Sequence, residues 1–162
     1  MNDSSTEILD GSADCVRAIR HLLNQAVTQV AIFSQNLEPQ LYNHQQVFEQ
    51  LAQLARKDKY SQVRIIAQQT RNAVADGHAL VRLAQRLPSY VTIRTPTTPE
   101  LQRFEQSWLI IDDHSICELT NPQRWEGKLI QFDRKYVRDQ LQFFNDAWEH
   151  SQPDSNSRRL GI

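Results

Sequence analysis

The sequence is short of glycine and cysteine, and each shortage argues against a class of site. Four glycines in 162 residues leave no glycine-rich loop of the kind that cradles phosphates. The two cysteines, Cys15 and Cys117, are far apart, and no Cys-x2-Cys or His-x3-His pair accompanies them. We therefore expect two reduced, buried thiols, no bound metal and no cofactor.

Net charge and long apolar runs are lacking too. The formal net charge is −1, which argues against a uniformly basic chain of the histone kind but leaves room for a local basic patch. No apolar run approaches the roughly 20 residues that a membrane helix needs. Residues 1–7 are polar and acidic, unlike a secretory signal. We expect a cytoplasmic protein without membrane contact.

What is present suits one ordinary domain. A length of 162 residues with 40% hydrophobic residues is enough for a single core. Polar composition at both ends predicts a flexible N-terminus over residues 1–11 and a flexible tail over residues 151–162. The folded domain should therefore span residues 12–150.

The spacing of apolar residues predicts helices and strands in alternation. Predicted helices span residues 12–27, 47–55, 72–87 and 134–149, and predicted strands span residues 29–34, 61–68, 91–94, 108–111, 115–119 and 128–132. Helices separate the early strands, whereas a hairpin joins two of the late ones. This order is typical of an α/β fold in which helices sandwich a mixed sheet.

One stretch, residues 103–113, carries the most specific pattern. The apolar run from Trp108 to Ile111 predicts a buried strand that ends at Asp112. Ser107 stands five residues before Asp112, and Glu105 stands seven before it. This spacing resembles the signature of the phospholipase D superfamily, in which a His, a Lys two residues later and an Asp five further on surround a phosphodiester.

The resemblance extends from about residue 13 to residue 150. A strand ending at Ser34, the Val-Arg-Ile-Ile strand and the closing helix also look like one half of the phospholipase D fold. The chain thus resembles a degenerate phospholipase D-like domain of the HKD superfamily. We expect it to belong to an uncharacterised bacterial family. The resemblance implies that two copies meet across a two-fold axis, within one chain or as a homodimer.

The positions that phosphodiester chemistry requires are altered. The superfamily uses its His as nucleophile and general acid, and its Lys to hold phosphate oxygens. Here Glu105 would repel phosphate and Ser107 carries no charge. We expect no catalytic residues and no phosphodiester transfer, and we expect Asp112 to serve the hairpin turn.

Basic residues gather in the middle of the chain. Residues 56–103 hold nine Lys and Arg against three acids, a net +6 that leaves the remainder at −7. On a helix over residues 72–87, His78, Arg82 and Arg86 would form one stripe, because each lies four residues after the last. With Arg94 they are candidate ligands for an anion or a nucleic-acid backbone. The alternative is a solvated helix face.

An aromatic residue in a loop is a second candidate. Arg124 and Trp125 lie between two predicted strands, where an exposed indole would suit base stacking or contact with a partner. Packing of Trp125 over the core is the alternative.

Three functions remain open from the sequence. The first is a non-catalytic phospholipase D-like module that binds an anionic ligand such as nucleic acid. The second is an interaction or regulatory partner of another bacterial protein, for example an acetyltransferase, because degenerate sequences of this type look like companions of such domains. The third is a remodelled phosphodiesterase.

Overall fold

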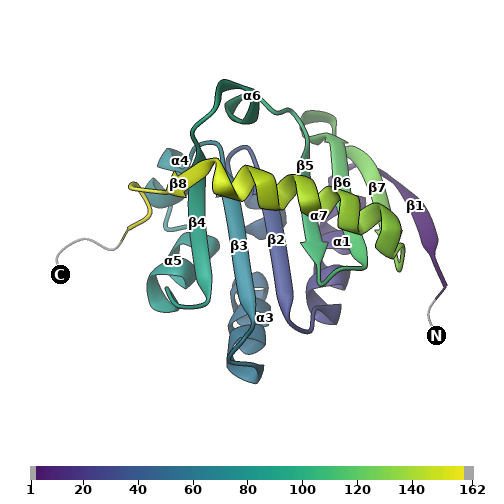
Figure 1. Cartoon of the computed structure of the whole chain (residues 1–162), viewed down its shortest axis with the longest axis horizontal. Coiled ribbons are helices and arrows are strands. Elements are labelled where there is room, and N and C mark those ends of the chain that lie inside the picture. Colours follow the sequence, from purple (N-terminus) through teal and green to yellow (C-terminus); the bar gives the residue numbers. More distant parts are fainter. Residues whose placement is uncertain (1–2, 159–162) are drawn as a thin grey trace.

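The computed structural model describes residues 3–158 and shows one mixed sheet between helices (Figure 1). Across these residues the sheet has eight strands, in the spatial order β1-β7-β6-β5-β2-β3-β4-β8. They are β1 (Ser5–Asp10), β2 (Gln29–Ser34), β3 (Gln62–Ala67), β4 (Val91–Pro96), β5 (Ser107–Ile111), β6 (Ser115–Asn121), β7 (Glu126–Gln131) and β8 (Ser151–Pro153). Strands β2, β3 and β4 are parallel, and the other neighbouring pairs are antiparallel. The predicted fold class is confirmed.

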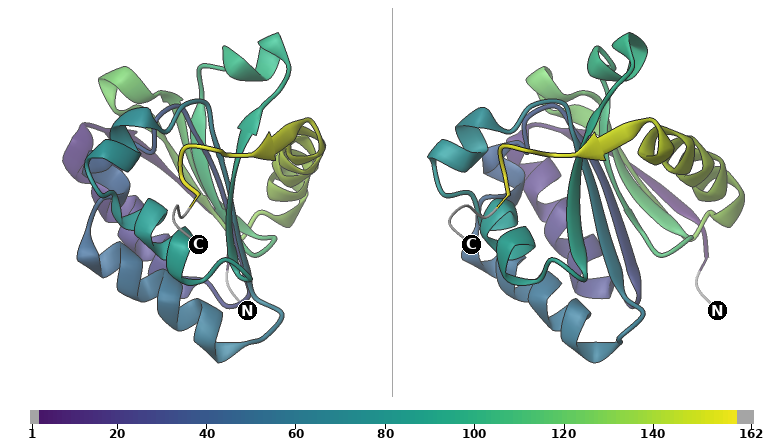
Figure 2. Two further views of the ribbon diagram at one scale, coloured as in Figure 1. Left: turned by 90° about the vertical axis from the view of Figure 1, so that its left-hand side faces the viewer. Right: turned by 60° about the vertical axis from the view of Figure 1, so that its left-hand side comes forward.

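The helices form two unequal layers, one on each face of the sheet (Figure 2). The thicker one, here called the helix layer, consists of α1 (Ser12–Gln25), α2 (Pro39–Tyr42), α3 (Gln45–Lys57), α4 (Arg71–Ala75) and α5 (Ala79–Arg86). The opposite layer is α7 (Arg134–Glu149), which packs through Val137, Phe144 and Trp148. The short α6 (Pro99–Gln102) and the 3-10 turn η1 (Pro122–Arg124) lie in loops. Each layer covers its own apolar core.

Strand β5 is buried on both faces, which accounts for its continuous apolar run. Trp108 and Ile110 belong to the core under α7, and Leu109 and Ile111 belong to the core under the helix layer. We call the edge of the sheet where β2, β3 and β4 end the carboxyl edge, and the opposite edge the amino edge. Because β5 runs antiparallel to β2, Ser107 lies at the carboxyl edge, and Asp112, just past β5, lies at the amino edge.

The helix predicted over residues 72–87 is broken in two. Gly77 has φ +62°, a backbone conformation that glycine adopts readily and other residues rarely do. The chain therefore leaves α4 after Ala75, and His78 caps the start of α5 by accepting a hydrogen bond from the Leu80 amide. An Asp-Gly pair is a turn signal, and apolar periodicity alone overlooked it.

Parts of both predicted flexible ends belong to the sheet. The prediction over residues 1–11 was wrong for Ser5–Asp10, because β1 pairs with β7 along its length. Only Leu9 is buried in β1, so the strand has no apolar alternation that could predict it. In the tail, Ser151–Pro153 form β8 beside β4, and Asp154 is buried. Residues 1–2 and 159–162 lie outside the described part of the chain.

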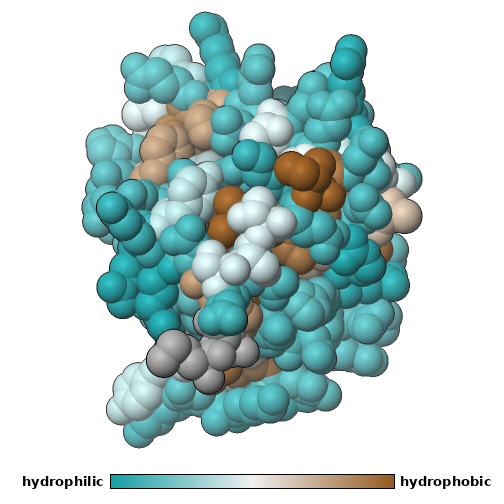
Figure 3. Space-filling model, turned by 90° about the vertical axis from the view of Figure 1, so that its right-hand side faces the viewer, coloured by the Kyte–Doolittle hydropathy of each residue, from teal (hydrophilic) through white to brown (hydrophobic). Residues whose placement is uncertain are grey.

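The side of the molecule that carries β1 is mostly hydrophilic, with small separate apolar patches (Figure 3). Ile8 on β1 is 67% exposed. The described residues of this side therefore form no broad apolar interface. None of the helices within residues 3–158 has the length and apolar character required to cross a bilayer.

Candidate functional site

At the amino edge, the Asp112 carboxylate holds the loop that precedes β2. It accepts hydrogen bonds from the backbone N–H groups of Val27, Thr28 and Gln29 at 3.1, 2.9 and 3.0 Å. The Thr28 hydroxyl donates a fourth bond at 3.0 Å. These contacts fasten the β5–β6 turn to the α1–β2 loop, so the Asp of the signature has a structural role here.

At the carboxyl edge, Ser107 contacts a carboxyl group that the sequence analysis did not single out. Glu38 is 8% exposed, and Ser107 Oγ donates to its Oε1 at 2.7 Å. Ser34 Oγ donates to its Oε2 at 2.5 Å and accepts from the Leu37 amide at 2.7 Å. Burial raises the pKa of Glu38, and the two serine hydrogen bonds oppose that rise. Glu38 follows the strand-end Ser34 by four residues, a position that gave no signal beyond that of a loop.

Glu105 stands apart from this buried cluster. Its side chain is exposed, and its backbone carbonyl accepts a hydrogen bond from Gln35 Nε2 at 3.0 Å. Thus neither Glu105 nor Ser107 supplies an imidazole or a cation. Among residues 3–158, no three His, Cys, Asp or Glu side chains gather as a metal site requires.

The carboxyl edge also has a pocket of about 400 Å³ beside this cluster. It is lined by Gln35, Asn36, Glu38, Pro39, Gln40, Pro122, Gln123 and Trp125. Trp125 is partly buried, and it both packs against the core and lines the pocket. Its backbone has φ +56°, and its carbonyl accepts hydrogen bonds from Gly11 N and Cys15 Sγ. Arg124 is exposed and is not among the lining residues.

The structure does not bring the four cationic candidates together. His78 is only 1% exposed: Nε2 donates to the Leu37 carbonyl at 2.8 Å, and Nδ1 accepts from Leu80. Burial lowers the pKa of His78, and this pattern of bonds requires the neutral ring. The predicted stripe is therefore wrong for His78, which is a buried cap and no part of an exposed ridge.

Arg94 lies on the opposite face from Arg82 and Arg86. Its guanidinium stacks 4.3 Å from the Trp148 ring under α7, and Nη1 donates to the Trp148 carbonyl at 2.9 Å. Arg82 and Arg86 are exposed on α5. They line a groove of about 500 Å³ between α3 and α5, together with Gln45, Phe48 and Gln85. Within residues 3–158 neither of these two arginines forms an ion pair.

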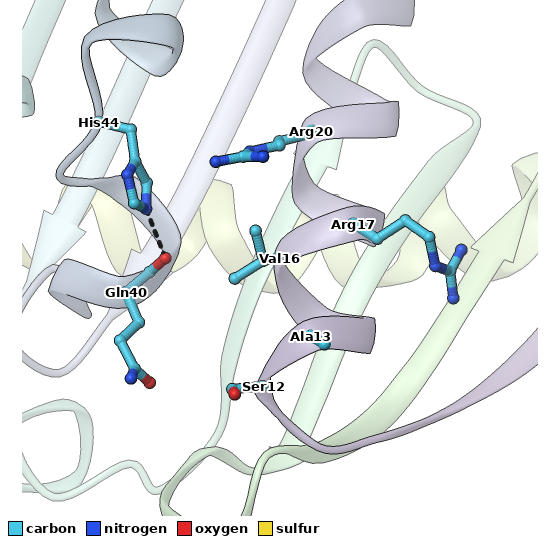
Figure 4. Close-up of a pocket in the computed structure, with 7 residues that line it drawn as sticks. All are labelled: Ser12, Ala13, Val16, Arg17, Arg20, Gln40 and His44. Carbon is cyan, nitrogen blue, oxygen red and sulfur yellow. Dashed lines mark hydrogen bonds between the residues drawn. The ribbon is translucent and has the colours of Figure 1, made fainter.

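A further cationic pocket lies in the helix layer, between α1 and α2 (Figure 4). It has a volume of about 530 Å³ and is lined by Ser12, Ala13, Val16, Arg17, Arg20, Gln40 and His44. Arg20 extends across the pocket toward His44, and the His44 ring points to the Gln40 carbonyl, to which its Nε2 donates. Arg17 points away from the pocket and pairs with Glu7. His44 comes from a different segment of the chain, so spacing along one helix could not predict its approach to Arg20.

The arginines of α7 are placed differently. Arg134 Nε and Arg138 Nη2 bind the Asp113 carboxylate at 3.3 and 2.8 Å. The hydrogen bond from Arg138 is the main cause that lowers the pKa of Asp113. The charge of these two arginines is therefore partly neutralised within the protein.

Comparisons with known proteins agree with this geometry at the level of the fold. Residues 11–160 match the family model described as "Domain of unknown function (DUF7931)". No curated protein matches the sequence.

Solved structures give the same architecture at low identity. Nuc from Salmonella typhimurium, a phospholipase D family member, is 14% identical, with a TM-score of 0.66 over 94% of this chain and 99% of Nuc. NucT from Helicobacter pylori is 11% identical, with a TM-score of 0.62 over 94% of this chain and 100% of NucT. The archaeal chromatin protein TrmBL2, which has a novel mode of DNA binding, is 14% identical, with a TM-score of 0.64. That alignment covers 92% of this chain and 54% of TrmBL2, so the chain spans about half of that protein. The chain therefore has a phospholipase D-like fold.

Proposed function

This chain belongs to the DUF7931 family, and we propose that it is a non-catalytic phospholipase D-like module that binds the phosphate backbone of nucleic acid. The absence of catalysis is supported by the signature positions. Ser107 is buried against Glu38, and Glu105 presents a negative charge to solvent. A phosphodiester placed there would meet no nucleophile of the superfamily kind and no cation.

The observation that carries the binding proposal is the pair of exposed arginines on α5. Arg82 Nε donates to the Gly77 carbonyl at 3.1 Å and its guanidinium lies over the Phe48 ring, which leaves its Nη groups for a ligand. Arg82 and Arg86 lie in one groove, and neither pairs with a carboxylate of the described chain. Guanidinium groups bind phosphate oxygens through two parallel hydrogen bonds. Gln45 and Gln85 line the same groove and offer additional polar contacts. Arg20 adds another unpaired cation to the helix layer. The DNA-binding neighbour TrmBL2 shows that a chain of this fold serves in a DNA-binding protein.

Fluorescence anisotropy with labelled oligonucleotides of about 20 nucleotides, at about 50 mM and about 150 mM NaCl, tests the proposal. The variant Arg82→Glu/Arg86→Glu should lose at least about tenfold in affinity. The slope of its log affinity against log salt concentration should decrease by the amount expected for about two phosphate contacts. The matched control is Lys128→Glu/Lys135→Glu, which changes the charge equally at exposed positions outside the helix layer. This control should bind nearly as the wild type does.

Two results would contradict the proposal. One is the absence of binding at the lower salt concentration, and the other is an equal loss in both double variants. A stoichiometric protein that copurifies without nucleic acid would favour the interaction-partner hypothesis instead. Turnover of a generic phosphodiester that Glu105→Ala abolishes would support the remodelled enzyme. Pairing of two copies, which the resemblance implies, stays a prediction that light scattering can measure.

A further inference from the structure

We infer that the protein has a site for a single nucleotide, built from two neighbouring pockets. The base pocket is the 400 Å³ pocket at the carboxyl edge that Trp125 lines. The phosphate pocket is the 530 Å³ pocket that Arg20 and His44 line, with Arg20 extending toward His44. The ligand is a nucleotide with an unpaired base, either free or within a single strand. For a strand, the inference deepens the proposed function, because it names the part of the nucleic acid that is recognised.

The two pockets share one lining residue, on α2. Gln40 lines both of them, and in Figure 4 its side chain extends toward Ser12 at the start of α1. The start of α1 is in turn bound to the loop of the base pocket. Gly11 N donates to the Trp125 carbonyl at 2.9 Å, and Cys15 Sγ lies 3.5 Å from the same oxygen. The start of α1, which lines the phosphate pocket, therefore adjoins the loop of Trp125, which lines the base pocket.

The base pocket suits a neutral, planar ring. Its lining includes the Trp125 indole and two prolines, and no Lys or Arg is among the lining residues. Both oxygens of Glu38 already accept hydrogen bonds from serines, so this buried carboxyl group forms part of the wall and disfavours anions. An indole stacks on any base, and side-chain amides match the donor and acceptor edges of bases.

The amides around the indole are available to a ligand. Within residues 3–158 the side chains of Asn36, Gln40 and Gln123 make no hydrogen bond to protein, although all three are exposed at the pocket. Each amide offers donors and an acceptor. Uncharged amides beside an aromatic ring, without a Lys or Arg among the lining residues, favour binding of a base over binding of a phosphate.

Unusual backbone conformations gather on the two loops of the base pocket. Leu37 has φ +62° and is fully buried, and Trp125 has φ +56°. A left-handed conformation is unfavourable for a bulky residue, and such conformations concentrate at ligand sites. Here the Leu37 amide is fixed by Ser34, and the Trp125 carbonyl by Gly11 and Cys15. The surrounding contacts thus hold both loops in the conformation that forms the pocket.

The phosphate pocket supplies the charge that the base pocket lacks. Arg20 is exposed and forms no ion pair within the described chain, while Arg17 is occupied by Glu7. His44 Nε2 donates to the Gln40 carbonyl at 2.7 Å, so Nδ1 can donate to a phosphate oxygen only when the ring is protonated. The Arg20 guanidinium is therefore the principal phosphate ligand, and a protonated His44 would add one further donor.

Calorimetric titrations with adenosine 5′-monophosphate, adenosine and inorganic phosphate test the site. Trp125→Ala should weaken binding of the nucleotide and the nucleoside by about tenfold, and Trp125→Phe should restore most of the affinity. Arg20→Ala should weaken binding of the nucleotide and leave that of the nucleoside unchanged. The matched control is Tyr60→Ala, which removes an aromatic side chain that is 75% exposed elsewhere and should change neither affinity.

Oligonucleotide binding separates this inference from the proposed function. Trp125→Ala should weaken binding of a single strand and spare a duplex of the same sequence, because paired bases cannot enter the pocket. If Trp125→Ala does not fold by circular dichroism, Asn36→Ala/Gln123→Ala takes its place with the same expectation. Nucleotide binding without oligonucleotide binding would uphold the site and contradict the proposed function. Oligonucleotide binding that these variants leave unchanged, without nucleotide binding, would overturn the site alone.

Discussion

The residues at the two ends of β5 make different kinds of contact. In the superfamily that the sequence resembles, the corresponding positions belong to one catalytic signature. At the amino edge, Asp112 accepts four hydrogen bonds from the α1–β2 loop. At the carboxyl edge, Ser107 stands where the Lys would be, and it binds the buried Glu38. Asp112 thus anchors a loop, whereas Ser107 takes part in a buried hydrogen-bonded cluster.

The difference lies in the groups that the two side chains bind. A carboxylate that satisfies several backbone N–H groups is costly to remove whatever the protein does, because its partners would lose their acceptor. A cation that only binds a substrate makes no hydrogen bond on which the fold depends. At the carboxyl edge, Glu38 instead forms a buried hydrogen-bonded cluster with two serines. Arg82 and Arg86, which are exposed and form no ion pair within residues 3–158, lie in the helix layer.

The largest expected effect comes from the amino edge. Asp112→Ala should lower the free energy of unfolding by about 3 kcal/mol, since three backbone N–H groups and a hydroxyl lose a charged acceptor. Asp112→Asn is the graded control, because it keeps one acceptor oxygen and should lose roughly half as much. Urea denaturation measures both changes. An unchanged stability of Asp112→Ala would show that water replaces the carboxylate and that the two edges do not differ in this way.

A smaller loss is expected at the carboxyl edge. Ser107→Ala removes one of the two hydroxyl donors of buried Glu38 and should cost about 1.5 kcal/mol. Ser61→Ala is a close control, because both serines are 2% exposed and the Ser61 hydroxyl has no hydrogen-bond partner within the described chain. That control should be neutral or slightly stabilising. Equal losses in the two variants would mean that packing of the hydroxyl matters and that its bond to Glu38 does not.

Sequence periodicity was sufficient for most of the fold. The apolar run of β5 and the stripe of α7 predicted both elements, because burial on two faces and on one face leave distinct patterns. Periodicity failed to predict elements that depend on backbone conformation or on strand pairing. Gly77 breaks the helix before His78, and β1 is held by pairing with β7 while only Leu9 is buried.

The candidate site was harder to predict than the fold. Periodicity placed His78 on the same stripe as Arg82, but the helix break turned the imidazole inward to the Leu37 carbonyl. Glu38 and Ser107 are 69 residues apart, and Arg20 lies on α1 whereas His44 lies in the loop between α2 and α3. Contacts of this kind arise from the order of the strands and the packing of loops, which local spacing does not encode.

The charge of Glu38 provides a more modest, pH-dependent prediction. Burial raises its folded-state pKa above the ordinary value of 4.5, so this group contributes stability below that pH and loses the contribution as pH rises through the folded-state pKa. Glu38→Gln removes the titration. The free energy of unfolding of this variant, relative to wild type, should therefore be higher at about pH 8 than at about pH 4. The exposed Glu105→Gln is the control at the same edge, and a relative stability of Glu38→Gln that is constant with pH would contradict the argument.

The smallest effect is expected beside Asp112, at the exposed Asp113. Asp113→Ala should cost less than about 1 kcal/mol, because its side chain is 39% exposed and salt screens its pairs with Arg134 and Arg138. The lowered pKa of Asp113 means that this contribution is present above its ordinary pKa of 3.8 and is lost as pH falls. The same variant frees two arginines on α7, so oligonucleotide affinity at low salt should rise by about threefold. Asp139→Ala is the matched control, because it removes an exposed carboxylate of α7 without freeing an ion-paired arginine. An equal rise in both variants would show that net charge, and not pairing with Asp113, keeps α7 from binding.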